Sequence, residues 1–150
     1  MTTVYDVPPD RLIEKLAAHL KSEYKLTPPD WTEDVRTGLH TEVEPVREDW
    51  WYVRSAAVLR KIYIKGPIGS DRLAEHFGGF KDRGSKPNKA VSGSRSIIRD
   101  ILKQFDAVGL TTKIPGSGRK IAPKGISACD NMAHEVMSKL AIENPELTKY

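Results

Sequence analysis

Hydrophobic residues return every three or four positions along most of this chain, with polar residues between them. This period places apolar side chains on one face of an α-helix, so the pattern predicts a mainly α-helical protein. Proline or a capping side chain precedes several of these segments and glycine follows them, which marks their ends. The expected helices cover residues 8–24, 30–37, 49–65, 70–77, 95–108 and 126–142.

Other stretches lack the helical period. Residues 39–47 have no clean period and predict a connecting loop. β-prone residues on both sides of a Pro-Gly-Ser-Gly turn predict a small hairpin over residues 110–122. Residues 143–150 are expected to form a frayed tail. The length suits a single domain over residues 1–150.

The helix expected over residues 49–65 has two different faces. At 100° per residue, one side gathers the residues expected in the core: Trp51, Tyr52, Ser55, Ala56, Val58, Leu59, Ile62 and Tyr63. The opposite side places Trp50 one turn from Arg54, together with Lys61 and Lys65, and Arg60 lies at its flank. An aromatic ring among cations suits stacking on bases while the cations meet phosphates. Packing of Trp50 under a neighbouring loop is the alternative.

Charge is unevenly distributed along the chain. The net charge is +4, but the segment from Lys81 to Lys124 holds eleven Lys or Arg and only three Asp, so the remainder of the chain is net acidic. A local positive field attracts polyanions, phosphate backbones above all. An acidic protein partner and a merely solvated basic face are the alternatives.

A helix, a turn, a basic helix and a hairpin follow one another between residues 70 and 122, which is the element order of a winged helix. The expected fold class is therefore mainly α, a winged-helix-like domain built around a central amphipathic helix with one small β-hairpin. The helix over 95–108 presents Arg95, Arg99 and Lys103 at spacings of four. The hairpin tip is expected to hold Arg119 and Lys120 beside them.

A long connection, residues 78–93, separates the two helices of this unit, where a DNA-reading unit has only about 3–4 residues. Its cations alternate with Gly, Ser and Pro, and they are Lys81, Arg83, Lys86 and Lys89. This composition predicts an adaptable loop that orders on irregular RNA, with a mobile basic loop as the alternative. The length of the loop argues against a DNA-binding transcription regulator, which is the alternative function.

No catalytic, metal or cofactor site is expected. Cys129 is the single cysteine and falls on the apolar stripe of the last helix, which predicts a core thiol in a reducing, cytosolic setting. The glycine-rich stretches lack the spacing of phosphate-binding loops. Met1 precedes polar residues, and no stretch approaches 18 apolar residues, so neither a secreted nor a membrane-spanning protein is expected.

Motifs along nearly the whole chain resemble one family. They are VYDVP at 4–8, PPDW at 28–31, EDWWYVRSAA at 48–57, LRKIY at 59–63, GPIG at 66–69, FGG at 77–79, GSRSIIR at 93–99 and GRKIAPKG at 118–125. In this order they resemble the archaeal and eukaryotic small-subunit ribosomal protein nineteen family (S-nineteen-e). The opening motif and the short tail look closer to archaeal members.

The resemblance implies a winged-helix fold, a place in the head of the small ribosomal subunit, and a role in maturation of its ribosomal RNA (rRNA). Trp50, Arg54 and Arg60 match the exposed Trp and Arg residues on the family's RNA-facing central helix. We expect a cytoplasmic protein, monomeric when isolated, with small-subunit rRNA and neighbouring ribosomal proteins as partners. The expected RNA-binding residues are Trp50, Arg54, Arg60, Lys61, Lys65, Lys81, Arg83, Lys86, Lys89, Arg95, Arg99, Lys103, Arg119 and Lys120.

Overall fold

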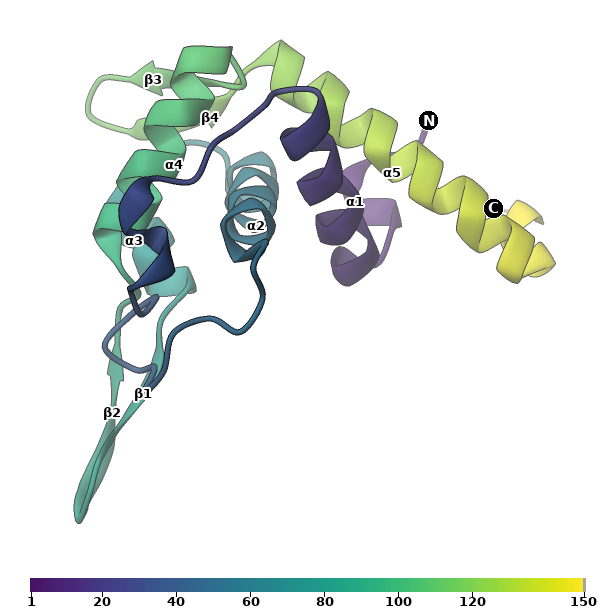
Figure 1. Ribbon diagram of the computed structural model, residues 1–150. Coiled ribbons are helices and arrows are strands. Elements are labelled where there is room, and N and C mark those ends of the chain that lie inside the picture. The colour runs from purple at the N-terminus through teal and green to yellow at the C-terminus, as the bar shows by residue number, and fades with distance from the viewer. Residues whose placement is uncertain (150) are drawn as a thin grey trace.

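The computed structural model describes residues 1–149, and this part of the chain is mainly helical, with two separate β-hairpins (Figure 1). The α-helices are α1 (Pro9–Ser22), α2 (Trp50–Lys65), α3 (Ser70–His76), α4 (Arg95–Val108) and α5 (Pro123–Glu143). The strands are β1 (Gly79–Arg83), β2 (Lys86–Val91), β3 (Thr111–Ile114) and β4 (Gly118–Ile121). Short 3₁₀ helices are η1 (Val4–Asp6), η2 (Asp30–Glu33) and η3 (Pro145–Lys149).

Helix α2 lies at the centre, and α1, α4, α5 and strand β4 pack around it (Figure 1). Its buried side is the one that the helical period predicts. This side consists of Trp51, Ser55, Ala56, Val58, Leu59 and Ile62. The Ser55 hydroxyl donates to the Trp51 carbonyl oxygen at 2.8 Å, so the polar group in this face is hydrogen-bonded within its own helix. Tyr52 and Tyr63 are half-buried at the edges of the face.

Helix α4 has the bounds and the two faces that the sequence predicts. The Ser94 Oγ accepts a hydrogen bond from the Ile97 backbone N–H at 3.5 Å, and Gly109 ends the helix with a left-handed φ of +79°. The buried side consists of Ile97, Ile98, Ile101, Leu102 and Phe105. The opposite side exposes Arg95, Arg99 and Lys103. The core therefore fixes the orientation of a basic ridge.

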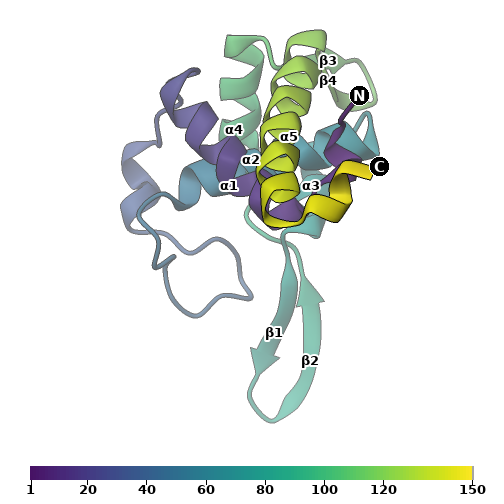
Figure 2. The same cartoon turned by 90° about the vertical axis from the view of Figure 1, so that its right-hand side faces the viewer.

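The prediction of a loop over residues 78–93 is wrong, because β1 and β2 form an antiparallel hairpin, which we call the arm. The arm projects away from the helices (Figures 1 and 2). At its tip, the Asp82 Oδ1 accepts from the Gly84 N–H at 2.9 Å, and Gly84 has a positive φ of +72°. Most of its side chains are exposed on both faces. Such strands need no alternation of apolar and polar residues, so the usual sequence signal is missing.

The expected fold class included one β-hairpin, and this number is wrong because residues 1–149 form two. The hairpin expected over residues 110–122 is present as β3 and β4, and the arm is the second. The arm leaves the two helices of the basic unit, α3 and α4, in contact with each other.

Most helix ends lie within two residues of the expected ones, but three other segments differ by more. The helix expected over 30–37 is only the short η2, and part of the tail over 143–150 forms η3 instead of fraying, with Tyr150 outside the described residues. Helix α5 begins at Pro123, three residues earlier than expected, because proline suits a first helical position. Its first turn packs so closely that a Cβ at Gly125 would lie 2.5 Å from the Leu110 carbonyl oxygen.

Candidate nucleic-acid interface

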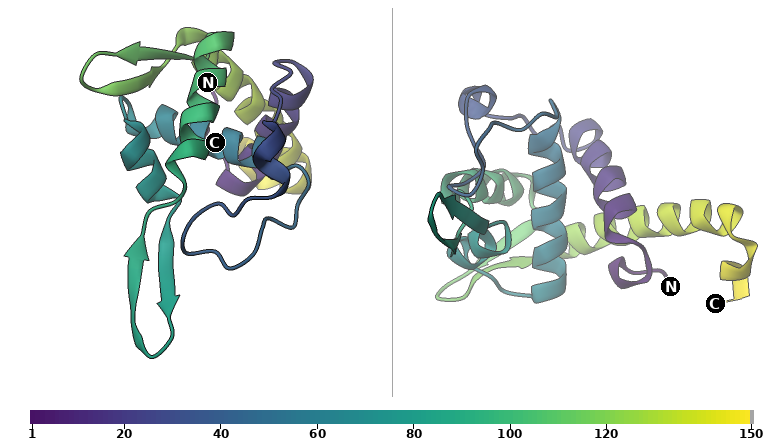
Figure 3. Two further views of the ribbon diagram at one scale, coloured as in Figure 1. Left: turned by 60° about the vertical axis from the view of Figure 1, so that its left-hand side comes forward. Right: turned by 90° about the horizontal axis from the view of Figure 1, so that it is seen from below.

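The solvent-facing side of α2 holds the five residues that the sequence predicts there, namely Trp50, Arg54, Arg60, Lys61 and Lys65. Only Lys65 is exposed, and the other four are half-buried. Seen from below, α2 lies in front of α5, on the side from which the arm projects (Figure 3). Most of this face is therefore partly covered by protein, and Lys65 alone among the five is exposed to solvent.

Arg54 packs on a ring rather than pointing freely into solvent. Its guanidinium carbon lies 4.7 Å from the centroid of the Phe77 ring, at the C-terminal end of α3. Burial lowers the pKa of Arg54, although an arginine remains charged at neutral pH. Arg54 thus links α2 to α3 through a cation–π contact, and only part of its surface can meet a ligand.

Trp50 is also held by the protein. Its ring meets that of Trp51 edge to face, with centroids 5.7 Å apart. It lines a hollow of ≈ 420 Å³ together with Pro28, Pro45 and Val46. Trp50 is therefore half-buried and packs partly against the core, while the rest of its ring borders the hollow.

Arg60 is half-buried at the flank of the face, as its angular position predicts. Its Nε is buried and has no hydrogen-bond partner among residues 1–149. A buried donor without an acceptor is costly in a folded protein. Arg60 is thus the cation of this face whose buried Nε–H lacks a hydrogen-bond acceptor among residues 1–149.

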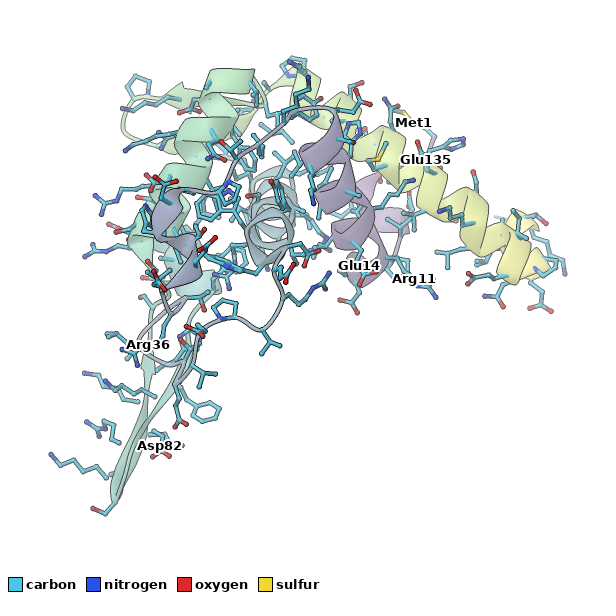
Figure 4. The ribbon with its side chains drawn as sticks, viewed as in Figure 1. Met1, Arg11, Glu14, Arg36, Asp82 and Glu135 are labelled. Carbon is cyan, nitrogen blue, oxygen red and sulfur yellow. The ribbon has the colours of Figure 1, made fainter. Side chains whose placement is uncertain are left out.

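The arm brings its four cations into opposing pairs. Lys81 lies opposite Lys89, and Arg83 lies opposite Lys86. Strand alternation places Lys81 and Arg83 on one side of β1 and Asp82 on the other, where Figure 4 shows it on the side toward α1. Like charges directly opposite each other destabilise a hairpin. The arm therefore has one strongly basic face.

The cations on the basic ridge of α4 form at most weak ion pairs with neighbouring residues. Arg95 lies 3.3 Å from Asp71 and Lys103 lies 3.5 Å from Asp100. Arg99 forms no ion pair among residues 1–149. Exposed pairs of this kind contribute little stability, so a phosphate can replace the carboxylate at small cost.

The β3–β4 hairpin contributes less than expected. The turn occupies residues 115–117, so Arg119 and Lys120 lie in β4 and not at the tip. Arg119 donates from Nε to Asp106 Oδ2 at 2.8 Å, and its backbone exchanges two hydrogen bonds with Ile68. Lys120 is exposed. Arg119 is therefore largely a structural residue.

Two cations near this surface, Lys113 and Arg36, were not predicted from the sequence as part of the interface. Lys113 is exposed opposite Arg119, and Arg36 lies at the base of the arm (Figure 4). Lys113 was part of the basic segment, so charge alone could have identified it. Arg36 stands in a net acidic part of the chain, and only its contacts in space place it beside α4.

The arm, α4 and the β3–β4 hairpin line one side of the molecule (Figure 1). The opposite side, formed by α1 and α5, has mixed charge (Figure 4). There Lys15 pairs with Glu135 at 2.8 Å and Arg11 with Glu143 at 3.7 Å. The structure therefore gathers most of the predicted cations on one side, with the α2 face between the arm and α1.

Reactive groups are not assembled into a site in the described part of the chain. Cys129 is fully buried, and burial raises its pKa to about 12, which disfavours the reactive thiolate. No group of three or more His, Cys, Asp or Glu residues within residues 1–149 is placed to hold a metal ion. None of the helices described is long and apolar enough to cross a bilayer.

The sequence is similar to proteins of one known family. The model of the family described as Ribosomal protein S19e matches residues 3–139. Small ribosomal subunit protein eS19 of Thermoplasma acidophilum is 43% identical over 150 residues, covering 100% of this chain and 99% of that protein. The eS19 protein of Aeropyrum pernix is 41% identical over 152 residues, with the same coverage. Small ribosomal subunit protein eS19A of Schizosaccharomyces pombe is 35% identical over 137 residues, covering 91% of this chain and 95% of that protein.

Proposed function

The chain belongs to the ribosomal protein S19e family, and from this premise we propose that it binds rRNA in the head of the small ribosomal subunit and supports maturation of that rRNA. Its role there is structural, and we propose no catalytic activity. Its partners are small-subunit rRNA and neighbouring ribosomal proteins, and the isolated protein is a monomer.

The opposing cations of the arm are the observation that supports rRNA binding most directly. Two pairs of like charges face each other across the hairpin, and one acidic residue, Asp82, lies among them on the other face. Their repulsion lowers the stability of the free arm. A phosphate backbone neutralises such charges and releases counterions, so the arrangement is favourable in a complex with RNA.

The helices next to the arm support the same function. Helix α3, helix α4 and the β3–β4 hairpin follow the order of a winged helix, and we propose that they form one. The cations Arg95, Arg99 and Lys103 then continue the basic surface from the arm along α4. Lys120 and Lys113 extend it to the second hairpin.

The alternative, a DNA-binding transcription regulator, is not favoured. Such a regulator places its second helix in a major groove, and its two helices are joined by a short turn. Here the arm stands between α3 and α4 and projects beyond both (Figure 2). It would meet the duplex before α4 could enter the groove.

The proposed function is tested by removing the charge of the arm. In the variant Lys81→Gln, Arg83→Gln, Lys86→Gln and Lys89→Gln, we expect weaker binding of small-subunit rRNA fragments and lower incorporation into small subunits. The slope of log affinity against log salt concentration should become shallower by roughly 3, because each phosphate contact contributes about 0.7–0.9.

The matched control changes four cations outside the proposed interface: Arg11→Gln, Lys25→Gln, Lys139→Gln and Lys149→Gln. It removes the same charge and should keep nearly the whole salt slope. Equal losses in the two variants would indicate a nonspecific effect of net charge. Unchanged rRNA binding in the arm variant would contradict the proposal.

A further inference from the structure

A groove of ≈ 550 Å³ lies between the segment that follows η2 and the first half of α4. The residues of its two walls lie more than fifty positions apart in the sequence. Its lining combines apolar side chains, cations and hydroxyl groups. Its volume lies in the range of sites that hold small ligands.

The apolar part of the groove is formed by Trp31, Val35 and Ile97. Ile97 is buried in the core, while Trp31 and Val35 are half-buried. The Trp31 ring meets the core residue Trp51 edge to face, with centroids 5.9 Å apart and planes at 85°. The core thus holds the Trp31 ring in place before any ligand arrives, which reduces the entropy lost on binding.

The polar part of the groove is cationic. Arg36 comes from one wall, and Arg99 and Lys103 come from the other. The single acidic residue of the lining, Asp100, lies 3.5 Å from the Lys103 ammonium, which compensates its charge. The Arg36 guanidinium donates to the Thr41 carbonyl oxygen at 3.1 Å, which restrains it beside the groove. The two guanidinium groups therefore leave the groove net positive.

The amino-terminal turn of α4 adds to this field. Ser94 and Ser96 line the groove, and the partial positive charge at the start of a 14-residue helix favours an anion beside them. The Ser96 side chain is exposed and offers a hydroxyl for a ribose or base. An aromatic side chain, cations and hydroxyls thus line one groove.

We propose that this groove binds one unpaired nucleotide of RNA, with its base on Trp31 and its phosphates on Arg36 and Arg99. The inference rests on the proposed rRNA binding and assigns a particular site within it. Proteins recognise unpaired RNA in this way, because only an unstacked base can lie on an aromatic side chain. An acidic peptide would match the cations but would leave the aromatic and apolar surface without a flat partner.

The test compares binding of a short oligouridylate with binding of a fully paired RNA duplex by fluorescence anisotropy. Trp31→Leu keeps an apolar side chain but removes the ring, and Trp31→Phe keeps a ring. We expect Trp31→Leu to weaken oligouridylate binding about 5- to 100-fold, the range for loss of one stacked base. Duplex binding should change little, and Trp31→Phe should restore part of the affinity.

Arg99→Gln provides a second variant that does not disturb the core, because Arg99 is exposed. It should weaken oligouridylate binding and make its salt slope shallower by about 0.7. Arg11→Gln, an exposed arginine on the opposite side of the molecule, is the matched control and should leave both unchanged (Figure 4). Circular dichroism shows whether each variant is folded.

The outcomes separate this site from the proposed function. Equal loss of duplex and oligouridylate binding in Trp31→Leu, or no loss in Arg99→Gln, would overturn the nucleotide site while arm-dependent rRNA binding stands. Competition by an acidic peptide as effective as by oligouridylate would also overturn it. Failure of the unmodified protein to bind any RNA would instead overturn the proposed function.

Discussion

Several cations of the proposed RNA surface also hold the fold together. Arg54 packs on Phe77, and Arg119 joins Asp106 while its backbone bonds to Ile68. The long stem of an arginine can bury apolar surface while its guanidinium stays available on one side. A loss of RNA binding on changing Arg54 or Arg119 can therefore come from a destabilised protein, and stability must be measured beside binding.

Replacement of Arg54 by alanine should lower the free energy of unfolding by about 1–2 kcal/mol, because the contact with Phe77 and the packing of the stem are lost. Denaturant unfolding measures this change. Lys65→Ala, at an exposed position of the same helix, should stay within about 0.5 kcal/mol of the unmodified protein. Equal changes in the two variants would show that the Phe77 contact contributes no stability.

Tyr63, at the edge of the core, should make the stability of the protein depend on pH. Burial, and then its hydrogen bond to Asp130 Oδ1 at 2.8 Å, raise the pKa of Tyr63 to about 12. In the unfolded chain a tyrosine loses its proton near pH 10. The stability that Tyr63 contributes is therefore complete below about pH 10 and is lost as the pH rises toward 12, because the unfolded state ionises first.

In a Tyr63→Phe variant, the free energy of unfolding should fall less steeply between about pH 10 and 12 than in the unmodified protein. Chemical denaturation at a series of pH values measures both slopes. Tyr52→Phe leaves the bond between Tyr63 and Asp130 in place and should keep the original slope. Identical slopes for the Tyr63 variant and the unmodified protein would contradict the conclusion that folding raises the pKa of Tyr63.

At the scale of the elements, the arm and α4 are adjacent in sequence but differ in what stabilises them. Helix α4 is amphipathic and capped, with five side chains in the core. The arm has exposed side chains on both faces, and β1 and β2 contact chiefly each other. Its order depends on its own ladder of hydrogen bonds, so its amide hydrogens should exchange faster than those of α4.

Excision of the arm should therefore leave the rest of the protein folded. A variant in which residues 80–90 are replaced by Asn-Gly joins Gly79 to Val91, which are opposite each other at the base of the hairpin. We expect thermal unfolding near that of the full chain and a large loss of rRNA affinity. A collapse of helical circular dichroism would show that the arm is needed for folding instead.

At the scale of the whole molecule, two sides of the protein differ in charge, although the net charge is only +4. The arm, α4 and the β3–β4 hairpin form the basic side, whereas α1 and α5 pair their charges with each other (Figure 1). A field of this kind orients the protein as it approaches a polyanion. The basic side should therefore face the rRNA.

Chemical acetylation of lysines in intact small subunits tests this orientation. Lys81, Lys86, Lys89 and Lys103 should be protected compared with the isolated protein, whereas Lys139 and Lys149 should react in both. Mass spectrometry of the digested protein measures each site. Protection of the α5 lysines together with full reactivity of the arm would reverse the proposed orientation.

Much of the fold could be predicted from local patterns. The buried face of α2, the bounds of α4 and the β3–β4 hairpin agree with the sequence because each depends on periodicity, caps and turn residues within one segment. The arm could not be predicted in this way. Its strands bury almost no side chains, so no apolar alternation distinguishes them from a loop.

In the candidate site, too, some features follow from local sequence patterns and others do not. The basic segment and the ridge of α4 follow from composition and helical spacing. The contact of Arg54 with Phe77, the pairing of Lys81 with Lys89, and the groove between Trp31 and Arg99 exist only in the folded chain.

The amino-acid sequence by itself determined where the helices α1 to α5 form, which of their faces enter the core, and where positive charge is concentrated. Those properties depend on residues within a few turns of each other. Tertiary structure alone decided which cations pack against protein, which oppose one another, and which meet an aromatic ring in a groove. These are contacts between distant segments, and they are set by how the apolar faces of whole elements fit together.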